Sequence, residues 1–260
     1  SLIANRIGGI EMSNENPMLE VKNLSKSFGT IKALDNVSFT LPRGKVFGIV
    51  GDNNAGRTTL LSILNGALQP DSGEFYLDGQ KADFKNPSDA YDSGVAMVHQ
   101  FVKLVDIASI WENFYLGREL TRKSGPITLL DLKKMRETTQ KTISGYGHKF
   151  DVDREVRQLS GGQRQIVAVT RAIDTNPKLL LLDEPYHGLS QRVINDIFAI
   201  LKDARESRGT SIIITTQWFE QIKDFVDEVM VMRRGRIVGH FDVEAADSGH
   251  IFKLAMGLAG

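Results

Sequence analysis

The feature that most constrains the fold is a set of three short apolar runs, "VFGIV" at residues 46–50, "LLLLD" at 179–183 and "SIIITT" at 211–216. Segments with helical periodicity separate them. Strands that helices cover on both faces show continuous apolar runs, whereas strands with one face in water alternate. The three runs therefore predict a parallel sheet between helices, which is an α/β core.

Other segments show different periods. Residues 18–28, 33–41 and 73–80 are partly alternating, rich in branched and aromatic residues, and separated by Gly, Pro and Asp, as is typical of antiparallel strands. From about residue 101 to about 156, apolar residues recur at spacings of three and four without a convincing strand, which predicts a mostly helical insertion. Residues 227–242 predict two strands joined near a glycine, followed by a short helical tail.

Composition narrows the functional classes. The 260 residues, 41% of them apolar, are enough for one large domain or two closely joined subdomains. Thirty-two basic and thirty-two acidic residues cancel, so the net charge gives no reason to expect nucleic-acid binding. No cysteine is present, which excludes disulfides and thiolate metal sites. No apolar stretch approaches the roughly 20 residues that span a bilayer, so we expect a cytoplasmic protein.

The stretch "GDNNAGRTT" at residues 51–59 lies between the first apolar run and a helical segment. A glycine-rich turn there lets backbone N–H groups and a helix N-terminus face phosphate oxygens. Gly51, Gly56 and Thr58 match the pattern G-x-x-x-x-G-K-[ST], but Arg57 stands at the lysine position. Taken alone, the stretch is equally compatible with a plain strand-to-helix turn.

Two further motifs favour the phosphate-loop interpretation. Asp183 and Glu184 end the second apolar run, where an aspartate typically holds Mg²⁺ and a neighbouring glutamate can accept a proton from water. "LSGGQ", from Leu159 to Gln163, precedes a helical pattern. In isolation, the acids could be a solvated loop and the serine a helix N-cap. Their order after the phosphate loop favours a nucleotide site.

Together these motifs resemble the nucleotide-binding subunit of ATP-binding-cassette (ABC) transporters across residues 18–242, most like the branch that serves carbohydrate and nucleoside importers. The resemblance implies a P-loop NTPase (RecA-like) core, an N-terminal antiparallel β subdomain and a helical subdomain that carries LSGGQ. It divides the chain into a leader or disordered segment at 1–17, the ATPase domain at 18–247 with the helical subdomain at about 101–165, and a C-terminal tail at 248–260.

The resemblance also implies residue roles around ATP and Mg²⁺. Phe28 would stack on adenine, Glu184 would be the general base, and Gln100 and Gln217 would act beside it. Thr58, Gln100 and Asp183 would hold Mg²⁺. The remaining nucleotide contacts would come from Gly51, Asn53, Asn54, Ala55, Gly56, Arg57, Thr58 and Thr59, and from Ser160, Gly161, Gly162 and Gln163, which would reach the nucleotide of the opposite subunit in a dimer.

Four positions depart from the family pattern. Arg57 replaces lysine, Asn54 replaces a glycine, Ser190 replaces an aspartate, and Gln217 replaces the switch histidine. The guanidinium is larger than an ammonium, and a neutral amide carries no charge to the γ-phosphate. Asn54 need not collapse the turn, because asparagine tolerates the left-handed backbone region. We therefore expect weak ATP binding and slow hydrolysis at this chain's own site.

The resemblance implies an ATP-binding subunit that drives import of a sugar-like or nucleoside-like solute. Its partners would be membrane permease subunits and a second ABC ATPase subunit, in a heterodimer or a homodimer. Its membrane association, on the inner face of the cell membrane, would be only through the permease. The alternative is a regulatory or structural nucleotide-binding module with little or no hydrolysis. A soluble ABC protein of DNA repair or translation lacks support.

Overall fold

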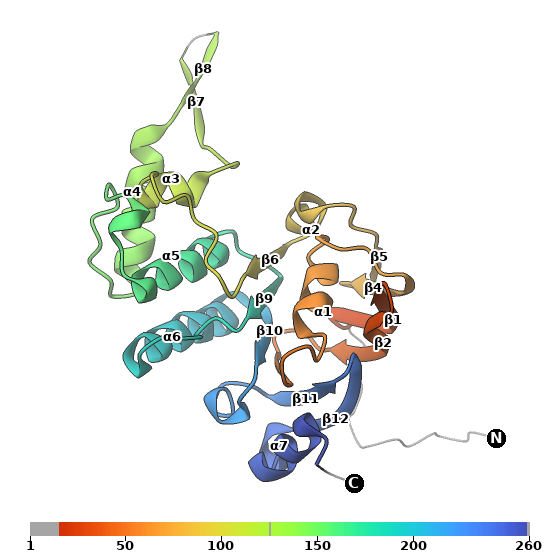
Figure 1. The fold of residues 1–260 in the computed structure, drawn as a ribbon. Coiled ribbons are helices and arrows are strands. Elements are labelled where there is room, and N and C mark those ends of the chain that lie inside the picture. Colours follow the sequence, from red (N-terminus) through yellow and green to blue (C-terminus); the bar gives the residue numbers. More distant parts are fainter. Residues whose placement is uncertain (1–15, 125, 259–260) are drawn as a thin grey trace, which may run out of the picture.

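The computed structural model describes residues 16–124 and 126–258. The segment at 1–17, predicted to be a leader or disordered, lies outside this part except for its last two residues. Figure 1 shows a central sheet with a smaller β layer on one side and a group of helices on the other. Within the described residues, no helix is both long and apolar enough to cross a bilayer.

The central sheet has the strand order β12-β11-β3-β10-β9-β6. Five strands are parallel, and β12 pairs antiparallel with β11 at one edge. The strands are β3 (Val46–Val50), β6 (Val95–Val98), β9 (Leu179–Asp183), β10 (Ser211–Thr216), β11 (Glu228–Arg233) and β12 (Arg236–Asp242). The predicted parallel core and the C-terminal strand pair are confirmed, whereas β6 was not predicted.

Burial explains why the three apolar runs identified the core. Every residue of β3, β9 and β10 is buried, so neither face of these strands needs polar residues. One face packs in a cluster with α1 (Arg57–Leu64), and the other with α5 (Gly161–Asp174), α6 (Gln191–Arg208) and α7 (Ser248–Met256). The helices thus exclude water from both sides of the sheet.

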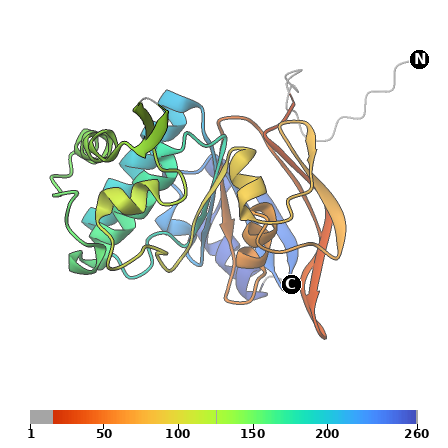
Figure 2. The same cartoon turned by 90° about the horizontal axis from the view of Figure 1, so that it is seen from above.

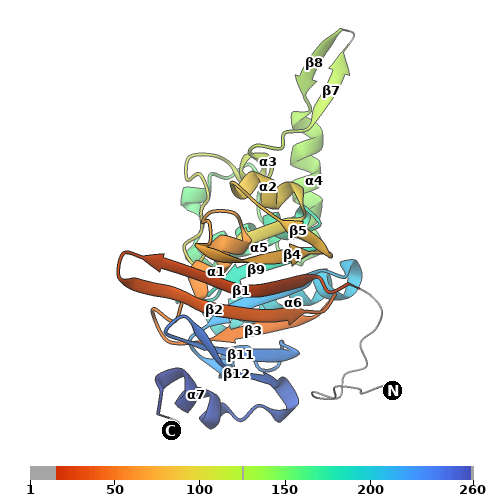
Figure 3. The same ribbon diagram turned by 90° about the vertical axis from the view of Figure 1, so that its right-hand side faces the viewer.

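The second sheet is antiparallel and has the order β2-β1-β4-β5. Its strands are β1 (Leu19–Phe28), β2 (Ile31–Leu41), β4 (Ser72–Leu77) and β5 (Gln80–Ala82). Figure 3 shows this sheet in front of α1 and the central sheet. The inward-facing residues of β1 and β2 join the same hydrophobic cluster as α1, and the predicted N-terminal antiparallel layer is confirmed.

The helical part lies on the opposite side of the molecule, as Figure 2 shows from above. Its helices α3 (Ile110–Tyr115) and α4 (Leu132–Gly145), with Val167 of α5, share a separate apolar cluster that includes Ile110, Phe114 and Met135. The expectation of no strand here was wrong. A hairpin of β7 (Thr121–Ser124) and β8 (Ile127–Leu130) interrupts the helices. Both strands are fully exposed, so no alternation of burial marks them in the sequence.

The remaining elements are short. They are α2 (Pro87–Asp92) and three 3-10 turns, η1 (Val156–Gln158), η2 (Phe219–Gln221) and η3 (Val243–Ala245). The side chain of Asn86 caps α2 by accepting hydrogen bonds from the backbone N–H groups of Ser88 and Asp89. The helix α7 closes the described chain, and its last turn ends at Gly257, whose φ of 72° is in the left-handed region.

Candidate nucleotide-binding site

The carboxyl ends of the parallel strands bring the phosphate loop, the acid pair, Gln100 and Gln217 to one edge of the central sheet. Thr216 at the end of β10 is opposite Val50 at the end of β3, and Thr215 is opposite Asp183. Val98 of β6 is opposite Leu182, which places Gln100 two residues beyond the same edge. Ligands of open α/β sheets bind at such an edge, because the loops that follow the strands converge there.

The phosphate loop joins β3 to α1 along this edge. Gly56, the N-cap of α1, has a φ of 103°, and Asn54 has a φ of 67°. A Cβ atom added to Gly56 would lie 2.3 Å from the carbonyl oxygen of Ala33, so both backbone angle and space require glycine. Asn54 holds its left-handed conformation without glycine, as expected. The turn is therefore built despite its departure from the family pattern.

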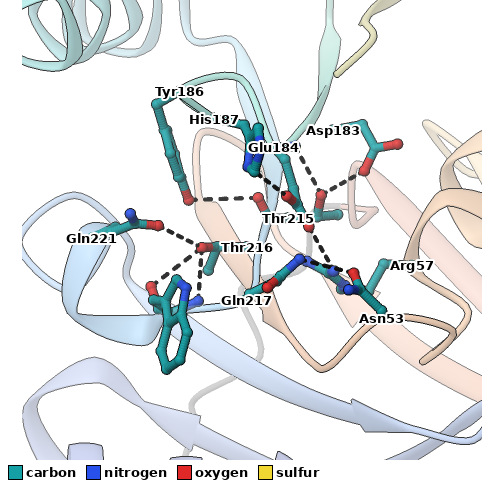
Figure 4. Close-up of polar contacts among 11 residues, drawn as sticks. Asn53, Arg57, Asp183, Glu184, Tyr186, His187, Thr215, Thr216, Gln217 and Gln221 are labelled. Atoms are coloured by element: carbon teal, nitrogen blue, oxygen red, sulfur yellow. Dashed lines mark hydrogen bonds and ion pairs between the residues drawn. The ribbon is translucent and has the colours of Figure 1, made fainter. Parts of the chain in front are cut away.

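Arg57 does not point into solvent. Its Nη2 atom lies 2.6 Å from Oε1 of Glu184, and the two side chains are only 7% and 9% exposed. Its Nη1 atom is buried and has no hydrogen-bond partner within the described residues. Buried donors are normally paired. The guanidinium therefore holds one carboxylate oxygen (Figure 4) and keeps one buried donor without a partner among the described residues.

Thr215 joins the two acids, and sequence reasoning did not single it out. Its Oγ1 atom donates to Oδ1 of Asp183 at 2.7 Å and accepts from the backbone N–H of Glu184 at 3.1 Å. Glu184 has a φ of 43°, an uncommon backbone conformation for a non-glycine residue. The threonine is the polar end of the apolar run "SIIITT", beside the acid that ends "LLLLD". A polar residue at the end of an apolar strand, next to a strand that ends in an acid, was the signal that could have identified Thr215.

Two further residues surround the acids. Tyr186 donates from Oη to the carbonyl oxygen of Thr215 at 3.5 Å, and burial raises the pKa of this hydroxyl, so that it stays protonated. Nδ1 of His187, an exposed side chain, lies 3.7 Å from Oε2 of Glu184. Figure 4 shows both side chains on the opposite side of Glu184 from Arg57. Basic groups thus lie near both oxygens of the carboxylate.

Gln217 contacts the phosphate loop directly. Its Nε2 atom donates to Oδ1 of Asn53 at 2.8 Å. Gly51 also donates its backbone N–H to the carbonyl oxygen of Thr216, at 3.2 Å. The position predicted to replace the switch histidine therefore lies beside the loop, and it presents a neutral amide there (Figure 4).

The residues predicted to hold Mg²⁺ offer oxygens of the type this ion prefers. Asp183 is buried and uses Oδ1 for Thr215, while its Oδ2 atom has no hydrogen bond to the described residues. Thr58 is exposed in the first turn of α1, and Gln100 is half-buried after β6. No group of three or more acids and histidines with metal-ligand geometry occurs in the described ranges. A cation here would therefore depend on hydroxyl and amide oxygens and on phosphate.

Phe28 lies at the end of β1 and is 48% exposed. It pairs across the hairpin with Ile31, two residues before Ala33, whose carbonyl oxygen borders Gly56. Nζ of Lys26 lies 5.8 Å from the centre of the Phe28 ring. The ring is therefore accessible near the phosphate loop, as stacking on a base would require.

The signature residues lie apart from the loop. Ser160 caps α5 with Gln163 in a reciprocal pair of hydrogen bonds, in which each backbone N–H donates to the other side chain. A Cβ atom on Gly162 would lie 2.9 Å from Cγ2 of Val193 in α6, whereas Gly161 has open space. No hydrogen bond joins these residues to the phosphate loop within the described part of the chain. Ser160 is thus the N-cap of α5, and the N-terminus of this helix is also exposed.

Comparison with known sequences decides the family. A family model described as "ABC transporter" matches residues 34–187, more than half of the chain. The chain belongs to the ABC transporter family. The match includes the phosphate loop, the signature and the acid pair.

Two relatives show how the chain compares with import proteins. It is 35% identical over 224 residues to the xylose/arabinose import ATP-binding protein XylG of Sulfolobus acidocaldarius, with 86% of this chain and 87% of the relative covered. It is 36% identical over 241 residues to the ribose import ATP-binding protein RbsA of Caldanaerobacter subterraneus, covering 93% of this chain and 48% of the relative. The chain thus spans about half the length of several curated relatives that it matches.

A solved structure agrees in fold. The ADP conformation of an ATP-binding cassette of an ABC transporter superposes with a TM-score of 0.77 at 26% identity, covering 93% of this chain and 95% of the other. The ABC ATPase cassette, with its parallel P-loop core, antiparallel β layer and helical part, is therefore the fold of this chain. ABC ATPases hydrolyse ATP as a family.

Proposed function

We propose that this chain is the ATP-binding subunit of an ABC importer for a sugar-like or nucleoside-like solute, and that its own nucleotide site hydrolyses ATP slowly. The similarity to RbsA and XylG supports the solute class. The buried ion pair between Arg57 and Glu184 carries the proposal of slow hydrolysis.

The site fits ATP in two respects. The N-terminus of α1 follows a left-handed turn at Gly56 and has no side-chain cap, so its backbone N–H groups could stabilise phosphate oxygens. The buried Nη1 atom of Arg57 has no hydrogen-bond partner among residues 16–124 and 126–258, and phosphate oxygens are strong acceptors for a guanidinium. Bound Mg²⁺ would neutralise phosphate charge, with Thr58, Asp183 and Gln100 as its proposed holders.

The ion pair works against hydrolysis. A general base must lie within hydrogen-bond reach of the attacking water. Oε1 of Glu184 is instead committed to Arg57 at 2.6 Å. Water activation at Glu184 would therefore use the other oxygen, Oε2, or require the contact with Arg57 to break. The family's lysine would instead present a compact ammonium, without the larger planar fork of the guanidinium.

The amide of Gln217 weakens the site further. It lies beside the phosphate loop through Asn53 but carries no positive charge. Loss of one preorganised donor to the charge that develops in the transition state commonly lowers the rate about 10²–10³-fold. Because effects within one constellation are not additive, Arg57 and Gln217 together need not multiply these factors.

The proposed partners are membrane permease subunits and a second ABC ATPase subunit. The exposed N-terminus of α5, with Ser160 and Gly161, is the surface we assign to the opposite nucleotide in a head-to-tail dimer. A heterodimer would let this intact signature complete a sound site in the partner. Recovery of only this chain and a permease from native membranes would instead indicate a homodimer. Membrane attachment through the permease would place the chain on the cytoplasmic face.

The decisive experiment restores the two family residues, in the variant Arg57→Lys/Gln217→His. We expect phosphate release by the unaltered chain far below the roughly 10 s⁻¹ of a typical enzyme. The double variant should hydrolyse at least about 100-fold faster, because both cationic contacts return. Adding Glu184→Gln to that variant is the control and should abolish the gain. A restored variant that binds ATP but gains no activity would favour the regulatory or structural module.

A further inference from the structure

The β7–β8 hairpin stands apart from the two larger sheets. It forms a sheet of its own, and both strands are exposed along their whole length. Figures 1 and 3 show it projecting beyond α4 as the tip of the helical part. A two-stranded hairpin by itself is only marginally stable in water. A contact outside the described residues would stabilise such a hairpin.

The apolar side chains of this hairpin are exposed within the described part of the chain. Ile127, Leu129 and Leu130 are 59%, 44% and 52% exposed, and they are three of the four residues of one strand. Leu132, which follows at the start of α4, is also exposed. Clustered exposed apolar residues on a monomer mark interaction surfaces, whereas scattered ones do not.

The strand register distributes these side chains over both faces of the hairpin. Arg122 is paired with Leu129, and the next pair on that face is Ser124 with Ile127. Leu130 lies on the other face with Lys123, because paired positions share a face and alternate along the strand. Each face thus combines a cation with an apolar side chain. A groove on a partner protein would cover one face of the hairpin, whereas the headgroup layer of a membrane would surround both faces.

The charge around the hairpin is positive. Lys133 and Lys134 follow it and are exposed, and Asp131 is the single acid between residues 121 and 134. That acid accepts the backbone N–H of Lys134 as the N-cap of α4. Lys133 lies 3.8 Å from Glu137, a weak, solvent-exposed pair. The local excess of cations matches an anionic surface even though the whole chain is neutral.

We propose that the hairpin surface, formed by Arg122, Lys123, Ile127, Leu129 and Leu130, inserts into the headgroup layer of an anionic membrane. Interfacial binding requires this combination of apolar side chains and basic residues. The contact is made by the chain itself and adds to attachment through a permease. This contact holds the helical part beside the membrane and does not require a bound nucleotide.

Vesicle flotation tests the contact with the whole chain and no nucleotide. The probes are vesicles of phosphatidylcholine alone and vesicles that also contain phosphatidylglycerol. We expect at least tenfold stronger binding to the anionic vesicles, weakened by added salt. Ile127→Ser/Leu129→Ser and Arg122→Glu/Lys123→Glu should each lower this binding at least tenfold, since each basic residue near such a surface contributes about fivefold. The matched controls Val238→Ser and Lys202→Glu, on β12 and α6, should bind as the unaltered chain does.

Both hairpin variants change exposed side chains, and circular dichroism will verify their fold. Equal binding to the two kinds of vesicle would overturn the proposal, as would variants that bind like the unaltered chain. The unaltered chain could also bind no vesicles, while the hairpin variants lose binding to a detergent-solubilised permease. That result would assign the hairpin to a protein partner and would likewise overturn the proposal. None of these outcomes depends on ATP hydrolysis.

Discussion

The ion pair between Arg57 and Glu184 makes a quantitative prediction about stability. In Glu184→Gln, the side chain keeps its size and can still accept a hydrogen bond, but it loses its charge. Removing one partner of a buried ion pair generally costs roughly 3–5 kcal/mol, because the other charge stays buried. A hydrogen bond from the guanidinium to the amide oxygen would return about 1.5–3 kcal/mol. We expect a net loss of about 1–3 kcal/mol.

The structure supports this loss of unfolding free energy rather than the small one expected for an exposed ion pair. Arg57 is 7% exposed, and its buried Nη1 atom has no partner in the part of the chain that the structure describes, so little solvent compensates the charge. The backbone N–H of Glu184 keeps its bond to Thr215 in the variant, and its φ of 43° is no worse for glutamine. The substitution therefore isolates the charge.

The assay is urea unfolding without nucleotide, monitored by circular dichroism. The matched control is Glu206→Gln, which removes an exposed carboxylate 3.8 Å from Lys202 and should leave the unfolding free energy unchanged. Adding Mg²⁺ and ATP should stabilise Glu184→Gln more than the unaltered chain, because phosphate replaces the missing negative charge. Equal stability of Glu184→Gln and Glu206→Gln would refute the reasoning.

Two further predictions concern neighbouring groups. Thr215→Val removes the donor to Asp183 in a buried network and should lower the unfolding free energy by about 1–3 kcal/mol; an unchanged urea midpoint would contradict this. Burial, together with the positive charge of Lys103, lowers the pKa of His99 below its ordinary 6.5. The unfolded chain therefore takes up this proton first as the pH falls below about 6.5, and stability declines in that window. In His99→Gln the decline between about pH 7 and pH 5 should be shallower, and parallel curves for the two proteins would disprove the role of His99.

The sequence by itself determined the layers of the fold and the three motifs of the nucleotide site. Continuous apolar runs predict strands that helices cover on both faces, and β3, β9 and β10 lie where those runs lie. The phosphate loop, the signature and the acid pair were recognisable because each needs particular residue types at fixed spacing. Thr215 and the strand β6 were missed, since one polar residue after an apolar run and a four-residue strand leave little pattern.

Only the tertiary structure decided what the unusual residues do. The sequence marked Arg57 as a departure but gave no reason to pair it with Glu184, which is 127 positions later. Parallel strands bring such distant loops to one edge, and burial then forces opposite charges to meet. The hairpin was hidden for the opposite reason. Its strands are exposed on both faces, so no burial period records them in the sequence, and they become visible only as an element projecting from the fold.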